Sequence, residues 1–157
     1  MSLPYRNKQR KRTPTYILIS DGFDELEVVF CLHKFRQEGL SIKSVSLYNR
    51  LVYSHQGVGL RADCQLADNP LDPASDCLLI LPTGGRNADE LRYDARVKSL
   101  LQSFNDGSGR VAITDTANHL ADDLNHVLIN KPLYHPDTGQ DLYDFVQNLA
   151  DRVVGAS

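Results

Sequence analysis

The feature that most constrains the fold is an alternation of short apolar, β-rich runs with longer amphipathic segments. The run at residues 15–20 stops at a tight turn, and residues 24–38 then carry apolar side chains at helical spacing. Residues 77–82 form a continuous apolar run, which is typical of a central strand covered on both faces. A further run at residues 110–114 is again followed by a helical pattern. The alternation predicts an α/β fold, a doubly wound and mostly parallel sheet with helices on both faces.

Weaker patterns indicate the remaining elements, and no internal repeat or low-complexity segment competes with them. We expect a strand within residues 41–48, short extended pieces over 51–66, helices over 91–104 and 116–124, a short strand at 127–130 and a closing helix over 142–153. Together with the stronger runs, these elements predict a single domain over residues 13–157.

Charge is distributed unevenly along the 157 residues, whose net charge is −3. Residues 1–12 carry five basic side chains and no acidic one, which leaves 12 basic and 20 acidic residues in the rest of the chain. We interpret residues 1–12 as a solvated, disordered arm and expect no nucleic-acid partner. A regulator that uses the arm on nucleic acid stays as a third hypothesis, and steep salt dependence of DNA binding would test it.

Several classes of protein are excluded by composition. The longest apolar runs fall far short of the ~18 residues that a membrane span requires, and residues 1–12 show no apolar core of a secretory signal. The three cysteines follow neither a disulfide framework nor a zinc pattern, and the histidines have no ligand spacing among themselves. We therefore expect a cytoplasmic protein without a membrane partner, a metal or a cofactor.

Three strand-to-helix turns carry the candidate functional residues. They are residues 21–27, Pro82-Thr83-Gly84-Gly85 and Thr114-Asp115-Thr116. In an open parallel sheet, the carboxyl ends of the strands meet at one edge, where backbone N–H groups of the following helices point outward. We expect the three turns to form one site at that edge.

These turns, in this order, resemble the ThiJ/PfpI family of the class I glutamine amidotransferase-like superfamily. The family's G-F-[DE]-[DE]-hydrophobic-E motif matches residues 22–27, its L-P-G-G motif matches residues 81–84, and its G-V-x-[IV]-x-A-D segment matches residues 57–63 with small drift. The resemblance covers about residues 15–130 and implies a flavodoxin-like fold and a homodimer. It also implies that Glu27 is the family's elbow glutamate and that the Gly84 N–H helps to form an oxyanion pocket.

The family's nucleophile elbow, a strand that ends in a reactive cysteine, has no cysteine here. The matching stretch is residues 111–115, and ungapped matching places Asp115 at the nucleophile position, whereas a one-residue deletion places Thr114 there. The chain therefore looks like a shortened member that lacks the elbow cysteine. Cys31, Cys64 and Cys77 fall elsewhere, and we interpret them as small structural thiols.

An aspartate at the elbow has three interpretations from its chemistry. Its oxygens could simply accept first-turn N–H groups as an ordinary helix cap does. If Glu27 lies beside it, as the resemblance implies, Asp115 and Glu27 could instead share a proton and perform acid–base work. A carboxylate fixed there would also imitate the shape and charge of a cysteine sulfinate, which would give a locked rather than a reactive site. A surface position for Glu27 in the first turn of its helix remains open.

Other candidates for the same site are less specific. Gly84, Gly85 and Thr116 are candidate binding residues, although a glycine after Pro-Thr can be a turn former only. His135 precedes Pro136 in what looks like a remnant of the family's approach to its last helix, and it is the better histidine candidate for the pocket. We expect His119 on an exposed side of its helix. Members of the family usually have a further strand pair and loop where residues 125–136 form a short connection here, so the resemblance implies that part of the family's pocket wall is missing.

The leading hypothesis is a ThiJ/PfpI-like protein without cysteine-dependent protease, amidase or deglycase activity, which binds a small molecule or a partner. The alternative is a hydrolase or glyoxalase-like enzyme of altered chemistry that uses Glu27 and Asp115 over Gly84. The identity of the small molecule is not readable from the sequence.

Overall fold

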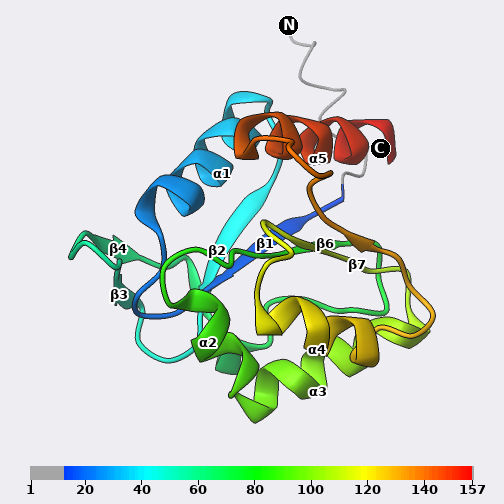
Figure 1. The fold of residues 1–157 in the computed structure, drawn as a ribbon, viewed down its shortest axis with the longest axis horizontal. Coiled ribbons are helices and arrows are strands. Elements are labelled where there is room, and N and C mark those ends of the chain that lie inside the picture. Colours follow the sequence, from blue (N-terminus) through cyan, green and yellow to red (C-terminus); the bar gives the residue numbers. More distant parts are fainter. Residues whose placement is uncertain (1–12, 157) are drawn as a thin grey trace, which may run out of the picture.

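A computed structural model describes residues 13–156, so the predicted basic arm, residues 1–12, lies outside the described residues. A six-stranded parallel sheet forms the centre (Figure 1). Its strands are β1 (Thr15–Ile19), β2 (Ile42–Ser46), β5 (Cys64–Gln65), β6 (Leu78–Leu81), β7 (Arg110–Ile113) and β8 (Leu133–Tyr134), in the spatial order β5-β2-β1-β6-β7-β8. Thr15 pairs with Ile42 on one side and with Leu78 on the other, so β1 and β6 are central.

Helices cover both faces of the sheet, which confirms the doubly wound α/β prediction. Figure 1 shows α1 and α5 on one face and α2, α3 and α4 on the other. Their bounds are α1 Glu25–Gln37, α2 Asn87–Arg92, α3 Ala95–Ser103, α4 His119–Val127 and α5 Leu142–Ala156. Short 3₁₀ helices occupy Leu66–Asp68 and Phe104–Asp106. No helix in the described residues is long and apolar enough to cross a membrane.

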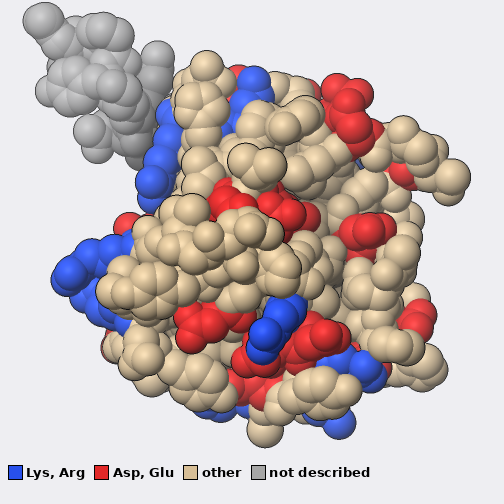
Figure 2. All heavy atoms as spheres, turned by 60° about the vertical axis from the view of Figure 1, so that its left-hand side comes forward, with Lys and Arg blue, Asp and Glu red and all other residues tan. Residues whose placement is uncertain are grey.

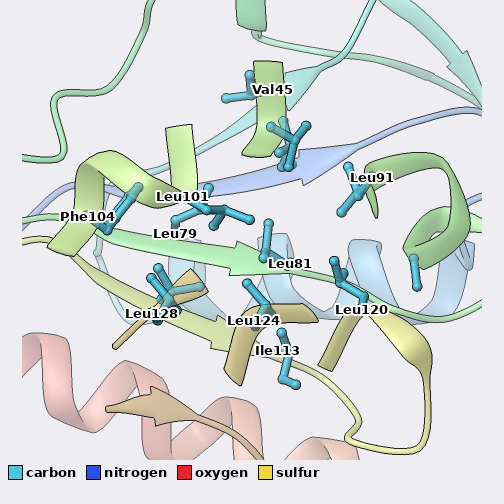
Figure 3. Close-up of a cluster of buried hydrophobic side chains, with 14 of the residues drawn as sticks. Val45, Leu79, Leu81, Leu91, Leu101, Phe104, Ile113, Leu120, Leu124 and Leu128 are labelled. Atoms are coloured by element: carbon cyan, nitrogen blue, oxygen red, sulfur yellow. The ribbon is translucent and has the colours of Figure 1, made fainter. Parts of the chain in front are cut away.

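The sheet separates two apolar cores, one under each helical layer. Phe23, Val28, Phe35 and Val146 belong to the core under α1 and α5, together with Ile17 of the sheet. The other core joins the sheet to α2, α3 and α4, and Figure 3 shows Leu79 and Leu81 meeting leucines of these helices. Because β6 is buried along its whole length, both cores are closed over the centre of the sheet.

Helix α1 begins and ends as its sequence predicts. The side chain of Asp24 accepts hydrogen bonds from the backbone N–H groups of Leu26 and Glu27, at 3.0 and 3.3 Å, and so caps the helix. Gly39 follows the last turn with φ of 75°, a conformation that favours glycine. These two signals fix where Glu27 lies relative to the end of β1.

The segment predicted as short extended pieces forms a separate antiparallel hairpin, β3 (Leu51–Tyr53) and β4 (Gly59–Arg61). Asp21 accepts a hydrogen bond from the Tyr53 N–H at 2.9 Å, and the His55 N–H donates to the Phe23 carbonyl at 2.7 Å. The hairpin is therefore attached to the turn between β1 and α1.

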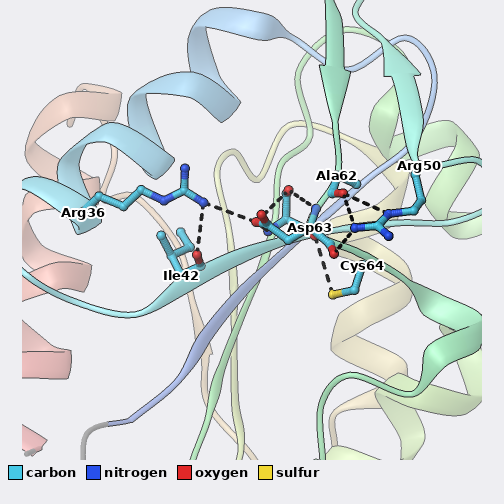
Figure 4. A network of polar contacts seen from close by, with 7 residues as sticks. Arg36, Ile42, Arg50, Ala62, Asp63 and Cys64 are labelled. Carbon is cyan, nitrogen blue, oxygen red and sulfur yellow. Dashed lines mark hydrogen bonds and ion pairs between the residues drawn. The ribbon is translucent and has the colours of Figure 1, made fainter.

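The chain after the hairpin is anchored by Asp63, the last residue of the stretch at 57–63 that resembles the family's G-V-x-[IV]-x-A-D segment. Its carboxylate accepts from the Ser44 N–H at 2.8 Å and pairs with Arg36 at 3.2 Å (Figure 4). Arg50 donates to the backbone carbonyls of Ala62 and Asp63 in the same network. Asp63 thus links β2, α1 and the start of β5, which is a structural role.

The helix predicted over residues 91–104 is wrong, because two helices occupy this stretch. Helix α2 ends at Arg92, and Asp94 caps the following α3 by accepting from the Arg96 N–H at 2.8 Å. Hydrogen bonds from the Arg96 side chain, and secondarily from the Tyr48 hydroxyl, lower the pKa of Asp94 to about 2. The helical spacing of apolar residues continues from α2 into α3, so it does not reveal the break at Tyr93 and Asp94 between the two helices.

The chain after β7 also differs from prediction. The helix expected over residues 116–124 is α4, which begins at His119 after the cap residue Asn118 and continues to Val127. The strand expected at residues 127–130 is wrong, since β8 pairs with β7 through Leu133 and Tyr134 instead. The β-rich residues at 127–129 close the end of α4, where Leu128 is buried.

The described surface is acidic on balance, with 20 acidic and 12 basic residues between positions 13 and 156. Figure 2 shows one face, on which Asp and Glu side chains gather in several patches with Lys and Arg beside some of them. Interspersed charges of both signs are typical of a solvated surface.

Candidate functional site

The carboxyl ends of β1 and β6 are joined by Asn87, which sequence analysis did not single out. The Asn87 side chain is fully buried and accepts from the N–H and the hydroxyl of Ser20, at 2.7 and 2.8 Å. It donates to the carbonyls of Pro82, at 2.7 Å, and Leu18, at 3.2 Å. One amide side chain therefore holds the turns that lead to Glu27 and Gly84.

Glu27 lies in the first turn of α1 and is buried, so its predicted alternative as a surface carboxylate is wrong. The residue is 9% exposed, and its Oε1 accepts a hydrogen bond from the Gly84 N–H at 3.0 Å. Burial raises the pKa of Glu27, and the hydrogen bond from Gly84, followed by the influence of Thr114, opposes that effect. The charge of Asp115 raises the pKa further, but it is the weakest of the influences on this group.

Thr114, not Asp115, is the buried residue at the end of β7. The Thr114 Oγ1 accepts from the Thr83 N–H at 2.8 Å and lies 3.0 Å from the Thr83 hydroxyl. Thr114 also favours the charged form of Glu27 and so lowers its pKa. The Thr114 hydroxyl itself is bound by the backbone N–H and the hydroxyl of Thr83.

Asp115 is exposed and does not cap the following helix, so the helix-cap interpretation is wrong. Its Oδ1 accepts from the Ala117 N–H at 3.1 Å in a local turn, and Asn118 caps α4 by accepting from the Ala121 N–H at 2.9 Å. Three residues separate Asp115 from the helix, because the chain makes a turn before α4 begins. Asp115 acts on Glu27 through its charge.

A polar pocket of about 610 Å³ lies over these groups. Five of the predicted site residues line it: Glu27, Thr114, Asp115, Thr116 and His135. The rest of the lining comes from the loop between β8 and α5 and from the first residue of α5, and consists of Pro136, Asp137, Thr138, Gly139, Gln140 and Leu142. Sequence analysis named only His135 of this loop as a site residue, although the stretch around it looks like a remnant of the family's approach to its last helix.

Gly84 and Gly85, two of the predicted binding residues, do not belong to the lining of this pocket. Gly84 contributes its N–H to Glu27, and a Cβ there would lie 2.7 Å from the Asp24 Cβ and 3.2 Å from the Glu27 Oε1. Gly85 has φ of 61°, and its own Cβ would collide with the Gly22 carbonyl. Both glycines are required by close backbone approach between the turns after β1 and β6.

None of the three thiols lies at the end of β7. Cys31 and Cys77 are buried, and burial raises the pKa of Cys31 to about 12 and that of Cys77 to about 11. Cys64 is partly exposed at the edge strand β5.

His119 is exposed on α4, as predicted. Within residues 13–156, no group of three or more His, Cys, Asp or Glu side chains is arranged to hold a metal ion.

The strand order defines the class of protein. The strands β2, β1, β6, β7 and β8 follow the 2-1-3-4-5 order of flavodoxin-like α/β folds, whose sites lie at the carboxyl edge where Glu27, Gly84 and Thr114 meet. The chain belongs to the DJ-1/PfpI family, whose family model matches residues 14–123. This is the family that the sequence motifs resemble.

Solved structures of the family show the same fold. Drosophila melanogaster DJ-1beta is similar with a TM-score of 0.73 and 16% identity, over 92% of each chain. A mutant of a DJ-1 superfamily protein from Salmonella typhimurium is similar with a TM-score of 0.72 and 18% identity, over 91% of each chain.

Among curated proteins, a deglycase from Thermococcus kodakarensis is 30% identical over 92 residues, which are 58% of this chain and 54% of that protein. An uncharacterized protein from Archaeoglobus fulgidus is 26% identical over 88 residues, 56% of this chain and 51% of that protein. The chain thus spans about half the length of the curated relatives that it matches.

Proposed function

We propose that this DJ-1/PfpI protein binds a small polar molecule in the pocket over Glu27 and does not catalyse the chemistry of a cysteine elbow. The observation that carries the proposal is the identity and bonding of Thr114. It occupies the buried position at the end of β7 and lines the same pocket as Glu27, and its hydroxyl is held by the backbone N–H and the hydroxyl of Thr83. A threonine hydroxyl that accepts a backbone N–H and is not hydrogen-bonded to a basic amine or imidazole is a poor nucleophile.

The carboxyl groups support binding more than proton transfer. Asp115 accepts a backbone N–H within its own turn, and the Glu27 carboxyl accepts the Gly84 N–H. A shared proton between two carboxyls requires a hydrogen bond between them, whereas the hydrogen bonds of the Asp115 and Glu27 carboxyls in the described residues go to backbone N–H groups. In this proposal Asp115 contributes negative charge to the pocket that it lines.

The alternative function is a hydrolase or glyoxalase-like enzyme in which Glu27 and Asp115 divide acid–base work. One observation favours it: Glu27 is a buried carboxyl with a raised pKa beside a pocket, which is a frequent property of catalytic acids. The relative from Thermococcus kodakarensis is named a deglycase, which is compatible with this alternative.

Turnover assays decide between the two functions. We expect the purified full chain to convert neither methylglyoxal nor an aminopeptidase substrate above background, and Glu27→Gln and Asp115→Asn to behave in the same way. Asp151→Asn, an exposed change on α5, is the matched control. Thiol-independent turnover by the wild type that Glu27→Gln abolishes and Asp151→Asn retains would contradict the proposal and establish the enzyme.

The predicted homodimer and the cytoplasmic location remain predictions for this chain. Sedimentation equilibrium of the full chain tests the homodimer directly, because a dimer doubles the observed mass. A concentration-independent monomer mass would contradict it.

A further inference from the structure

The lining of the pocket is one-sided in charge. Glu27, Asp115 and Asp137 contribute three carboxyl groups, and no Lys or Arg belongs to the lining that the described residues form. His135 is the one basic side chain among the lining residues, and its Nδ1 lies 3.0 Å from the Pro136 carbonyl. A concave surface with charges of one sign concentrates the field and raises the local concentration of ligands of the opposite sign.

The rest of the lining supplies neutral hydrogen-bonding groups. Thr116 and Thr138 carry exposed hydroxyls, and Gln140 carries an amide whose Oε1 accepts from the Asp137 N–H at 2.9 Å. That bond leaves the Gln140 amide NH₂ as a donor. A ligand that complements this set has a cationic group and a neutral polar remainder with an oxygen acceptor.

Because Glu27 is buried, its charge favours a cation more strongly than the charge of an exposed carboxylate would. Asp115 and Asp137 lie at exposed positions, where solvent screens them, whereas Glu27 is 9% exposed and lies at the base of the same pocket. Interactions with a charge in such a position are screened less than those at the surface. An anion that enters the pocket meets three carboxyl groups and loses hydration without compensation.

We infer that the pocket selects small molecules that carry a primary ammonium group and a neutral amide or hydroxyl group. The inference rests on the proposed binding function and specifies its ligand class. Ammonium is favoured because its three N–H donors match several carboxyl acceptors at once, and the neutral end matches the donor left by Gln140 and the threonine hydroxyls.

A matched set of probes tests the inference on the full chain. 4-Aminobutanamide, 4-hydroxybutanamide and succinamate share a short amide-bearing chain and carry an ammonium, a hydroxyl and a carboxylate, respectively. Backbone amide NMR shifts of residues 114–116 and 137–140 report binding in the pocket. We expect the ammonium probe to bind at least about tenfold more tightly than the hydroxyl probe, and the carboxylate probe to leave these shifts unchanged.

Charge-neutralising variants connect the preference to the pocket. Asp137→Asn and Asp115→Asn keep the shape of each side chain, and each should weaken the ammonium probe about threefold to tenfold without weakening the hydroxyl probe. Asp151→Asn, outside the pocket, should change neither affinity. The amide spectrum of each variant shows whether it is folded.

Each outcome is decisive. Equal or tighter binding of the hydroxyl or carboxylate probe in the pocket would overturn the inference and leave the proposed binding function standing. Binding of the ammonium probe that Asp151→Asn weakens as much as Asp137→Asn would assign it to general surface charge and overturn the inference as well. If no probe shifts the pocket residues, the inference fails for ammonium ligands of this size, while the turnover assays decide the proposed function separately.

Discussion

The backbone N–H of Gly84 donates to the Glu27 carboxyl across 3.0 Å, although 57 residues separate them in the chain. The bond joins the turn after β6 to the first turn of α1, and both turns converge because β1 and β6 are adjacent parallel strands. The donor that holds the buried Glu27 carboxyl is therefore a backbone N–H and not a side chain. The geometry of the pocket floor therefore depends on how closely the two turns approach.

That close approach predicts a severe effect of Gly84→Ala. The added Cβ would lie 2.7 Å from the Asp24 Cβ, so one of the two turns must move and the bond to Glu27 lengthens. We expect a loss of about 1–3 kcal/mol in the free energy of unfolding, measured by urea denaturation. Gly155→Ala is the matched control, since nothing lies within 4 Å of its Cβ and alanine favours the helix. Equal stability of Gly84→Ala and wild type would show that the turns do not touch.

The buried position of Glu27 predicts a specific pH dependence of stability. Burial raises its pKa above the ordinary 4.5, so the folded protein binds this proton more tightly than the unfolded chain does. The free energy of unfolding of the wild type, taken relative to Glu27→Gln, should therefore fall as the pH rises from the ordinary value through the raised pKa, and stay level above it. Urea denaturation of both proteins from about pH 4 to about pH 8 measures the difference. A difference that rises with pH would contradict the raised pKa.

The arrangement of the thiols predicts which of them reacts in the native protein. Iodoacetamide should modify Cys64 at least about tenfold faster than Cys31 and Cys77, because the last two are buried and their thiolates are disfavoured. Peptide mass spectrometry identifies the modified residue, and Cys64→Ser should remove the rapid phase. Faster labelling of Cys31, one helical turn from Glu27, would reveal an accessible thiol near the pocket and would argue against cysteine-free function.

The sequence predicted the strands well where local pattern and tertiary environment agree. Both faces of β6 are buried, so all of its residues are apolar, and this continuous apolar run is sufficient to identify the strand from the sequence. Capping residues were harder to read. Asp94 divides α2 from α3, and Asn118 rather than Asp115 begins α4, because the same residue types also occur in ordinary turns.

The site was predicted where a motif marks it and missed where tertiary contacts alone create it. Glu27 and Gly84 were found through their motifs, and His135 through its place before a proline. Asp137 and Gln140 belong to the loop between β8 and α5, and the local sequence does not show that they line the same pocket as Glu27 and Thr114. Asn87 has the same limitation, since nothing in its neighbours shows that its amide reaches across two strands.

The contacts of Asn87 predict a large loss of stability when its side chain is truncated. Asn87→Ala would leave the Ser20 N–H and hydroxyl without their acceptor, and the Leu18 and Pro82 carbonyls without their donor, all in a fully buried region. Because each buried group left unpaired costs about 1–3 kcal/mol, we expect the free energy of unfolding to fall by about 3 kcal/mol or more. Asn148→Ala, at an exposed position of α5, should change it by no more than about 0.5 kcal/mol.

A second variant separates the two halves of the Asn87 network. Asn87→Asp retains the acceptor for Ser20 but replaces the donor to the two carbonyls, so an ionised carboxyl would face the Leu18 and Pro82 oxygens. We therefore expect Asn87→Asp to be strongly destabilised near neutral pH and to recover in part as acid protonates the new carboxyl and restores a donor. Urea denaturation at neutral and acidic pH measures the recovery relative to wild type. A variant equally stable at both pH values would show that the donor half of the amide does not hold the two strand ends together.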